Sequence, residues 1–336
     1  MDILSKRPSI NTVLLFIHSL FYVINLSSYL VILKLIETQF NYNNFWFNTL
    51  LSVVLAPTYF IWLTNPETRK RIRLYRKTII FPILAGACYC LESILLYYSV
   101  NNLNLSYYTI LRSSFIIWNI PFFIFFLKKR ISPLYWISCF LLLVSYSFSI
   151  YFYISNYGDS WKPTIAIILS CIINSTYNNI IEHSLKQYHI QNIDYQLLFQ
   201  NTYFILAIAP STYFSIKNPP PINSQIVLYF FCVATMLQIY GYNKLAILRD
   251  NSNGRIPSNV LMSGLDLIRR FILLTFSFLM FDEPLNIYIV ISMGLFIVSS
   301  ILLFVDYIFP IKRNNTQQME VEISEKDGEE QIELLP

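Results

Sequence analysis

Three ionisable residues lie close together in a strongly apolar stretch of the sequence. Val260–Phe281 has the length and composition of a membrane-spanning helix, yet it contains Asp266, Arg269 and Arg270. A charged side chain at the bilayer centre costs roughly 2.5–3.5 kcal/mol on insertion scales. One carboxylate neutralises one arginine, so one cation remains in surplus. A surplus cation at membrane depth indicates a functional site, and its sign favours an anionic solute.

The spacing of these three residues limits how they can pair. On a helix Asp266 can reach either Arg269 or Arg270, three and four residues further on. The two arginines point roughly 100° apart, so they do not share a face. We expect one to pair with Asp266 and the other to face a cavity or another helix, where its planar fork suits phosphate. The alternative is that structural pairs hold both.

A second charged pair is expected between the stretches 79–100 and 105–127. Glu92 and Arg112 lie at similar distances from the short turn around Asn101–Asn104 that joins the two stretches. A rise of 1.5 Å per residue puts both at about the same depth, so the spacing predicts an ion pair. The pair either fixes helix packing or contacts the solute, and Glu92 is also a candidate proton-coupling carboxylate.

Polar residues also follow single faces of other apolar stretches. They include His18, Asn25 and Tyr29; Asn174, Asn178 and Glu182; Gln200 and Asn201; and Gln238, Tyr242 and Asn243. Amides inside a membrane often only hold helices together. Their occurrence in both halves of the chain also fits a central hydrophilic cavity.

The composition indicates a helical membrane protein with several spans. The 336 residues are 55% hydrophobic and only 13% charged, whereas soluble domains have about 25% charged residues. Seven glycines and no phosphate-binding loop argue against ATP-driven transport by this chain. No catalytic cluster stands out, so we expect neither an enzyme nor a cofactor or metal. A metal-dependent enzyme using His183 and His189 is a weaker alternative.

We expect an all-α fold of about ten membrane spans. The apolar stretches are 12–34, 44–64, 79–100, 105–127, 133–154, 163–182, 195–216, 225–247, 257–281 and 285–309. Basic residues gather in alternate loops, most densely between Arg69 and Lys77 and at Lys128–Arg130, whereas Lys162 and Lys217 face the other side. The positive-inside rule then places both termini in the cytosol. Nine or eleven spans are the alternatives.

The chain also has the pattern of a duplication. Lys128–Arg130 and Asp282–Pro284 each end one apolar stretch and are followed almost at once by another. We therefore divide the chain into a cytosolic N-terminus (1–11), two five-helix halves (12–154 and 155–309) and a cytosolic tail (310–336). Five is odd, so the second half is inverted. Inverted repeats are typical of alternating-access carriers, with the site near the midplane between the halves.

Two segments resemble nucleotide-sugar transporters of the drug/metabolite transporter superfamily. Asp266-Leu267-Ile268-Arg269-Arg270, followed by Phe281-Asp282-Glu283-Pro284, is similar to the Gly-Ala-Leu-Asn-Lys motif and later Phe-Asp-x-Pro of GDP-mannose transporters. Arg270 falls on the motif's lysine and Asp266 on its glycine. Phe199-Gln200-Asn201-Thr202 resembles their Phe-Tyr-Asn-Asn motif, with Phe199 and Asn201 matching and Gln200 and Thr202 departing.

The resemblance implies a function and a role for each motif residue. Such carriers exchange a nucleotide sugar for a nucleoside monophosphate across Golgi or ER membranes. Arg270 would bind phosphate, Asp266 would orient it or Arg269, and Phe199, Gln200 and Asn201 would contact the nucleoside. The departures from the motifs leave the particular sugar open. A carrier of a phosphorylated sugar or a nucleobase, or a non-transporting membrane scaffold, are the alternatives.

The expected partners are the anionic solute and the lipid bilayer, with a second copy of the chain as a further candidate and no nucleic acid. The acidic tail, 314–336, is expected to be disordered. Within it Glu330, Leu334 and Leu335 resemble a di-leucine sorting signal for an adaptor. That signal gives an endosomal, lysosomal or vacuolar membrane as the alternative to Golgi or ER.

Overall fold

The computed structural model is all-α in the part of the chain that it describes, as the sequence predicts. The described residues are 10–55, 61, 64–74, 78–125, 132–157, 161–187, 190, 192–221, 223–250, 258–281 and 287–308. The expectations for residues 1–9, for Lys128–Arg130, for Asp282–Pro284 and for the tail with Glu330, Leu334 and Leu335 lie outside the described residues.

The described residues form twelve helices. The helices of the first half are α1 (Ile10–Phe40), α2 (Phe45–Val53), α3 (Pro66–Leu74), α4 (Ile80–Asn102), α5 (Leu105–Arg112), α6 (Phe115–Phe125) and α7 (Pro133–Tyr157). Those of the second half are α8 (Trp161–Gln187), α9 (Asn192–Lys217), α10 (Ser224–Asp250), α11 (Ser258–Phe281) and α12 (Ile287–Ile308).

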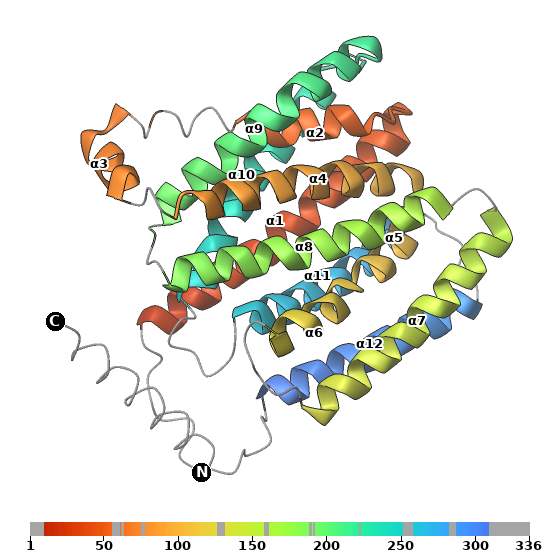
Figure 1. The fold of residues 1–336 in the computed structure, drawn as a ribbon. Coiled ribbons are helices and arrows are strands. Elements are labelled where there is room, and N and C mark those ends of the chain that lie inside the picture. Colours follow the sequence, from red (N-terminus) through yellow and green to blue (C-terminus); the bar gives the residue numbers. More distant parts are fainter. Residues whose placement is uncertain are drawn as a thin grey trace, which may run out of the picture.

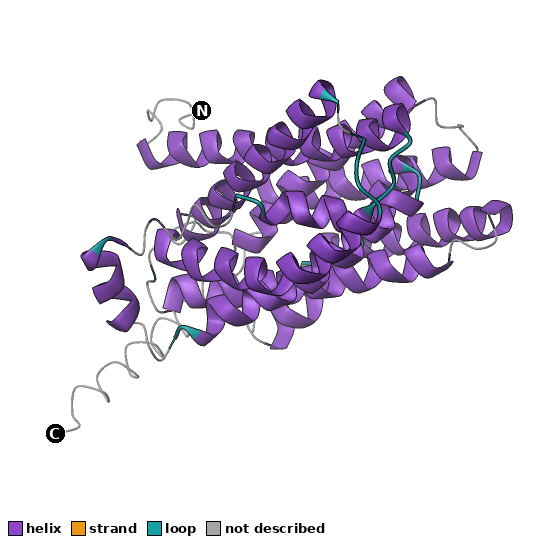
Figure 2. Cartoon of the chain, turned by 90° about the horizontal axis from the view of Figure 1, so that it is seen from above, coloured by secondary structure: helices purple, strands orange, loops and turns teal. Residues whose placement is uncertain are grey.

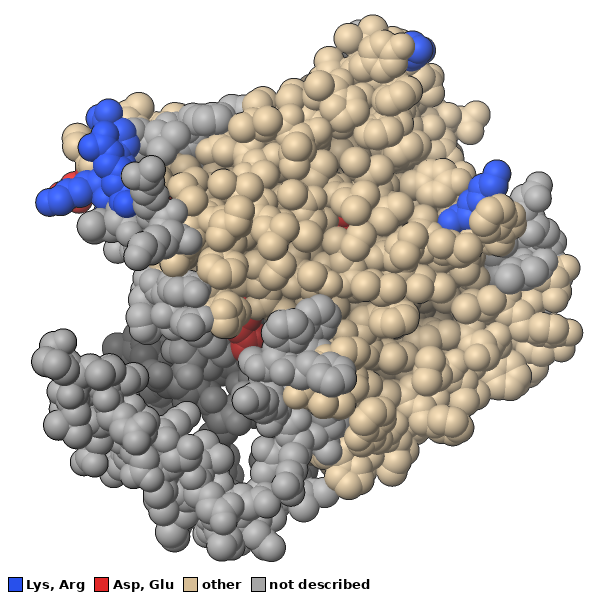
Figure 3. Space-filling view, viewed as in Figure 1, with Lys and Arg blue, Asp and Glu red and all other residues tan. Residues whose placement is uncertain are grey.

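Five of the described helices are long and apolar enough to cross a membrane, namely α1, α4, α7, α8 and α10. A shorter apolar segment, Ile287–Leu303, lies in α12. This is the pattern of a multi-pass membrane protein. The outside of the bundle agrees with it, because large apolar side chains such as Phe140, Phe231 and Leu279 are exposed. On the face shown in Figure 3 the visible lysines and arginines of the described part lie at the ends of the bundle, and only small areas of acidic residues are visible between them.

The long helices run alongside one another in a single bundle (Figure 1). α7 and α12 form one edge and α2 and α9 the other, with α1, α4, α8, α10 and α11 between them. The view from above shows the same bundle, with α3 at one end of it (Figure 2). Two reciprocal serine contacts join α7 to α12: Ser138 and Ser299 each donate to the other's carbonyl, and Ser145 and Ser292 do the same.

The expected span 105–127 is divided into two helices, α5 and α6, at Ser113 and Ser114. The amides of Ser113 and Ser114 donate to the carbonyls three residues earlier, each at 3.0 Å, which tightens the turn and ends α5. The hydroxyl of Ser113 also donates to the carbonyl of Thr109. Such competition by serine often bends membrane helices. The break lies directly after Arg112, so that arginine is placed at a helix end.

The basic loop expected after residue 64 contains a helix, α3. Asn65 caps it by accepting from the amide of Glu67 at 2.9 Å. Pro66 occupies the first helical position, where its missing amide hydrogen costs nothing, and Arg71 and Arg73 lie in the last turn. Arg71 makes a two-point ion pair with the buried Asp194 at the start of α9, at 2.9 and 3.2 Å. This pair fixes α3 against the bundle.

Candidate functional site

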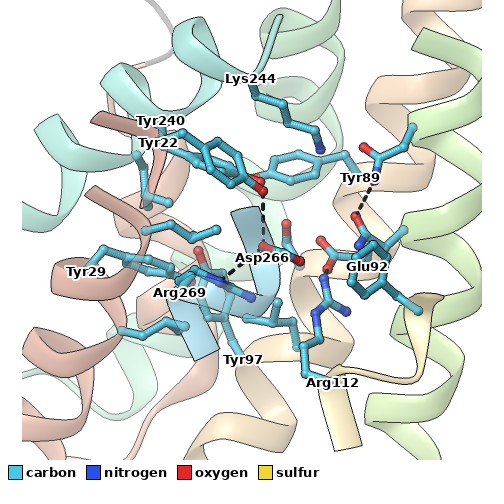
Figure 4. A pocket seen from close by; sticks show the side chains of 18 of the residues that line it. Tyr22, Tyr29, Tyr89, Glu92, Tyr97, Arg112, Tyr240, Lys244, Asp266 and Arg269 are labelled. Carbon is cyan, nitrogen blue, oxygen red and sulfur yellow. Dashed lines mark hydrogen bonds and ion pairs between the residues drawn. The ribbon is translucent and has the colours of Figure 1, made fainter. Parts of the chain in front are cut away.

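A cavity lined by charged and tyrosine side chains lies in the centre of the bundle. Its lining residues come from α1, α4, α5, α6, α8, α10 and α11, and they include Tyr22, Tyr29, Tyr89, Glu92, Tyr97, Tyr108, Arg112, Asn174, Tyr177, Asn178, Tyr240, Lys244, Asp266 and Arg269. The volume open to the centre of a water molecule is about 40 Å³. That is room for a few waters. Figure 4 shows these side chains converging from several helices.

The expected ion pair between Glu92 and Arg112 is present on one wall of the cavity. The Nη2 atom of Arg112 donates to Oε1 of Glu92, and its Nη1 atom donates to the hydroxyl of Ser170 at 2.6 Å. Both charged side chains are buried. The guanidinium also sits at the carboxyl end of α5, where the helix dipole favours a cation. A buried charge needs both a counter-charge and hydrogen bonds, and this pair has them.

Asp266 on α11 binds both neighbouring arginines rather than one. Its Oδ1 lies 3.2 Å from Nε of Arg269, and its Oδ2 lies 3.0 Å from Nη2 of Arg270. The hydroxyl of Tyr22 also donates to Oδ1, at 3.2 Å. The arginines therefore approach the carboxylate from its two sides, one to each oxygen. The expectation that only one arginine would pair with Asp266 does not hold.

The two arginines differ in what they face, and the difference is opposite to our expectation. Arg269 lines the cavity, whereas Arg270 does not and is 0% exposed. The guanidinium of Arg270 lies 4.9 Å from the ring centre of Phe115, at the start of α6. Its Nε and Nη1 atoms have no hydrogen-bond partner among the described residues. Arg269, not Arg270, is therefore the arginine that a solute in this cavity would meet.

The predicted nucleoside contacts on α9 lie outside the cavity. The ring of Phe199 packs at 5.1 Å against that of Tyr89, and it is Tyr89 that lines the cavity. Gln200 and Asn201 are buried and are not lining residues either. The structure thus brings Glu92, Arg112, Asp266 and Arg269 together around the cavity. The three α9 residues lie outside it, behind the residues that line it.

Lys244 on α10 also lines the cavity and is not among the predicted site residues. Its Nζ atom donates to the hydroxyl of Tyr177 at 2.8 Å and lies 4.2 Å from the centre of that ring. A signal was available, because Lys244 lies inside the apolar stretch predicted for 225–247. Lys244 lies close to the cytosolic end of that stretch, where lysines are common in membrane proteins, so its position did not indicate a functional site.

The polar faces of the other helices divide between the cavity and its surroundings. Asn174 and Asn178 on α8 line the cavity. The Nδ1 atom of His18 on α1 instead donates to Oδ1 of Asn243 on α10 at 2.7 Å, which holds those two helices together. No group of three or more histidines, cysteines, aspartates or glutamates in the described part of the chain could hold a metal ion.

Comparisons with known proteins define the fold more than the function. No family model and no curated protein matches the sequence. Among solved structures 27 chains are similar. One of them, a crystal structure of a protein, superposes with a TM-score of 0.55 over 87% of this chain and 95% of its own length, at 11% identity. At that identity the similarity shows the fold alone. Fold and site together define an all-α, multi-pass membrane protein with a charged central cavity.

Proposed function

We propose that this protein is a secondary transporter that carries an anionic organic solute across a membrane by alternating access. The solute class that we favour is a nucleotide sugar, exchanged for a nucleoside monophosphate across a Golgi or ER membrane. The protein would act as a carrier and not as an enzyme.

The charge balance of the cavity is the observation that carries this proposal. Three cations, Arg112, Lys244 and Arg269, line it together with only two carboxylates, Glu92 and Asp266. Arg270, on the far side of Asp266, adds another cation beside the same wall. Surplus charge at membrane depth is costly and is kept where it serves a function. A nucleoside monophosphate, with a charge of about −1.5 to −2 at pH 7, would neutralise it.

The pairing of the helices supports a ten-span inverted repeat, counting α5 and α6 as one span and omitting α3. In such a repeat α4 is equivalent to α10, and α8 is equivalent to α1. The α4–α8 pair should therefore be matched by an α10–α1 pair, and both pairs are in close contact. The α2–α9 and α7–α12 pairs map onto themselves. Such an arrangement of halves around a central site is the basis of alternating access.

The sequence supports the same repeat through one constant shift. Ser138 and Ser145, which join α7 to α12, precede Ser292 and Ser299 by 154 residues (292 minus 138, and 299 minus 145). The same shift takes Arg112 to Asp266 (266 minus 112). The two halves would therefore place opposite charges at equivalent positions, and each would be held by a counter-charge of its own half.

The narrowness of the cavity also agrees with alternating access. Sites for ligands of this size usually have a volume of about 300–1,000 Å³. The space of about 40 Å³ in this conformation therefore requires the halves to separate before a nucleotide enters. Separation that moves the ring of Tyr89 would also uncover Phe199, which packs against it. Phe199, Gln200 and Asn201 would then contact the nucleoside in the open conformation only.

Exchange in proteoliposomes tests the proposal. Vesicles preloaded with uridine or guanosine monophosphate should take up the matching labelled nucleotide sugar, and unloaded vesicles should take up much less. Replacing Arg269, which lines the cavity, by glutamine should reduce uptake at least about tenfold, the effect of losing about 1.4 kcal/mol of binding. Arg73→Gln, on the exposed face of α3, is the control and should leave uptake unchanged.

The same uptake assay, repeated with other solutes, also separates the alternative functions. If the vesicles take up a phosphorylated sugar but no nucleotide sugar, the anion site is supported and the solute is a phosphorylated sugar instead. A nucleobase carrier would be insensitive to Arg269→Gln, because an uncharged base does not need the surplus cation. If no anion shows saturable uptake, the proposed function is wrong and the remaining alternative is a non-transporting membrane scaffold.

A further inference from the structure

Lys244 is a buried cation without a carboxylate partner. It is 5% exposed, and within the described part of the chain it makes no ion pair. Its Nζ atom instead rests against Tyr177, bonded to the hydroxyl at 2.8 Å and lying over the ring at 4.2 Å, with Tyr240 more distant at 6.0 Å. Figure 4 shows the side chain reaching from α10 towards the interior of the cavity.

A second buried lysine of the same chain shows how such a charge is usually stabilised. Lys34 on α1 is 9% exposed and binds both oxygens of Glu37, at 3.0 and 2.9 Å, as well as the carbonyl of Leu103 at 3.3 Å. Lys244 has one neutral hydroxyl and the face of a ring. Since a lysine ammonium has three donors, its hydrogen-bonding capacity is not filled by these partners. The ammonium of Lys244 therefore keeps donors for a further acceptor in the cavity that it lines.

We propose that Lys244 is the second cation of an oxyanion site, and that Lys244 and Arg269 together bind a phosphate or pyrophosphate group in the central cavity. Both line that cavity, from α10 and α11. Asp266 fixes Arg269 in place through one oxygen, whereas the flexible Lys244 is free to turn from Tyr177 towards the ligand. The inference rests on the proposed function in one respect, because it assigns the charged group of the same solute.

Tyr177 has a definite part in this arrangement. Its hydroxyl and ring hold the ammonium when no anion is present, and binding of the anion must break that contact. Tyr177→Phe removes the hydroxyl and keeps the ring. The variant should therefore bind the anion more tightly, by a factor of a few up to about tenfold, because a hydrogen bond to a charged group no longer competes. A merely structural tyrosine would not increase affinity when it is truncated.

Binding to the purified full-length protein tests the site without any assumption about transport. Isothermal calorimetry with pyrophosphate, inorganic phosphate, uridine monophosphate and uncharged uridine measures each affinity. Lys244→Gln should weaken the binding of pyrophosphate and of the nucleotide at least about tenfold. Lys244→Arg should restore most of it. The matched control is Lys217→Gln, because Lys217 is exposed and also lies over a tyrosine ring, that of Tyr213 at 4.5 Å.

The phosphate probes identify the source of the oxyanion. Tighter binding of uridine monophosphate than of inorganic phosphate would show that the group belongs to a nucleotide. Equal binding of the two would point to free phosphate. Equal pyrophosphate affinity in the wild type, Lys244→Gln and Lys217→Gln would overturn the assignment of Lys244, and so would weaker binding in Tyr177→Phe.

A covalent probe gives a second readout. The aldehyde of pyridoxal 5′-phosphate condenses with the lysine nitrogen once the ammonium has released a proton to solvent. The condensation releases water, and borohydride reduces the resulting imine to a stable amine. Peptide mass spectrometry should find Lys244 labelled by this phosphate-bearing probe, protected by pyrophosphate, and labelled less by pyridoxal. Lys34, held by Glu37, should remain unlabelled.

The site and the transport proposal can fail separately. If pyrophosphate binding depends on Lys244 but the protein has no exchange activity, the transport proposal is wrong and the site is retained. Exchange that is unchanged in Lys244→Gln would overturn the site alone.

Discussion

Glu92 and Asp266 each bind arginine in the core, but the two carboxylates differ in how many arginines they bind. Glu92 has Arg112 as its ion-pair partner, and the two form a neutral pair. Asp266 has both Arg269 and Arg270, so that group has a surplus positive charge. Arg270 is also the less satisfied of the two, because it is fully buried with two nitrogen atoms that lack a hydrogen bond among the described residues.

This difference predicts contrasting effects on stability. Arg112→Met should destabilise the protein by roughly 3–5 kcal/mol, because it leaves the carboxylate of Glu92 buried and uncompensated. Arg270→Met should cause no loss of stability, because Asp266 keeps Arg269 and a poorly hydrogen-bonded charge is replaced by an apolar side chain. Thermal unfolding in detergent measures both. A large loss of stability in Arg270→Met would show that the surplus charge is structural.

At the scale of elements, a glycine allows α4 and α9 to approach closely. A Cβ atom at Gly86 on α4 would lie 2.6 Å from the carbonyl oxygen of Phe199 and 2.9 Å from Cβ of Thr202. The first of these is a backbone atom and cannot rotate away. Gly86 therefore sets the distance between α4, which carries Tyr89 and Glu92, and the helix behind the cavity wall.

We accordingly expect Gly86→Ala to destabilise the protein by about 1–3 kcal/mol, the usual effect of overpacking a filled core. The control is Gly294→Ala on α12, where an added Cβ meets nothing within 4 Å. That variant should be as stable as the wild type or slightly more so, because alanine is favoured over glycine inside a helix. Equal melting temperatures for both variants would mean that α4 and α9 can separate without loss.

At the scale of the whole molecule, the exposed basic residues define two ends of the bundle. α3, with Arg69, Lys70 and Arg73, lies at one end, and Lys162 and Lys217 are at the start of α8 and the end of α9. The excess of basic residues near α3 predicts that this end faces the cytosol. The proposed orientation of the carrier depends on this assignment.

Cysteine labelling tests the orientation. Lys70→Cys should react with a membrane-impermeant maleimide added from the cytosolic side of sealed vesicles, because Lys70 is exposed on α3. Lys217→Cys should react only after the vesicles are permeabilised. The unsubstituted protein, with its five native cysteines buried or half-buried, is the control. Reaction of both variants from the same side would contradict the topology.

The sequence by itself determined the helical class, the apolar stretches and the presence of charge within them, because these follow from composition and local spacing. It also predicted the Glu92–Arg112 pair, since a short turn between two helices fixes their relative depth. Only the tertiary structure decided that Arg269 faces the cavity and Arg270 does not, that Lys244 joins the cavity, and that Phe199 stays behind Tyr89. The rotation of a helix about its axis depends on the side chains of its neighbours, such as Phe115 beside Arg270, and the spacing within one helix does not specify it.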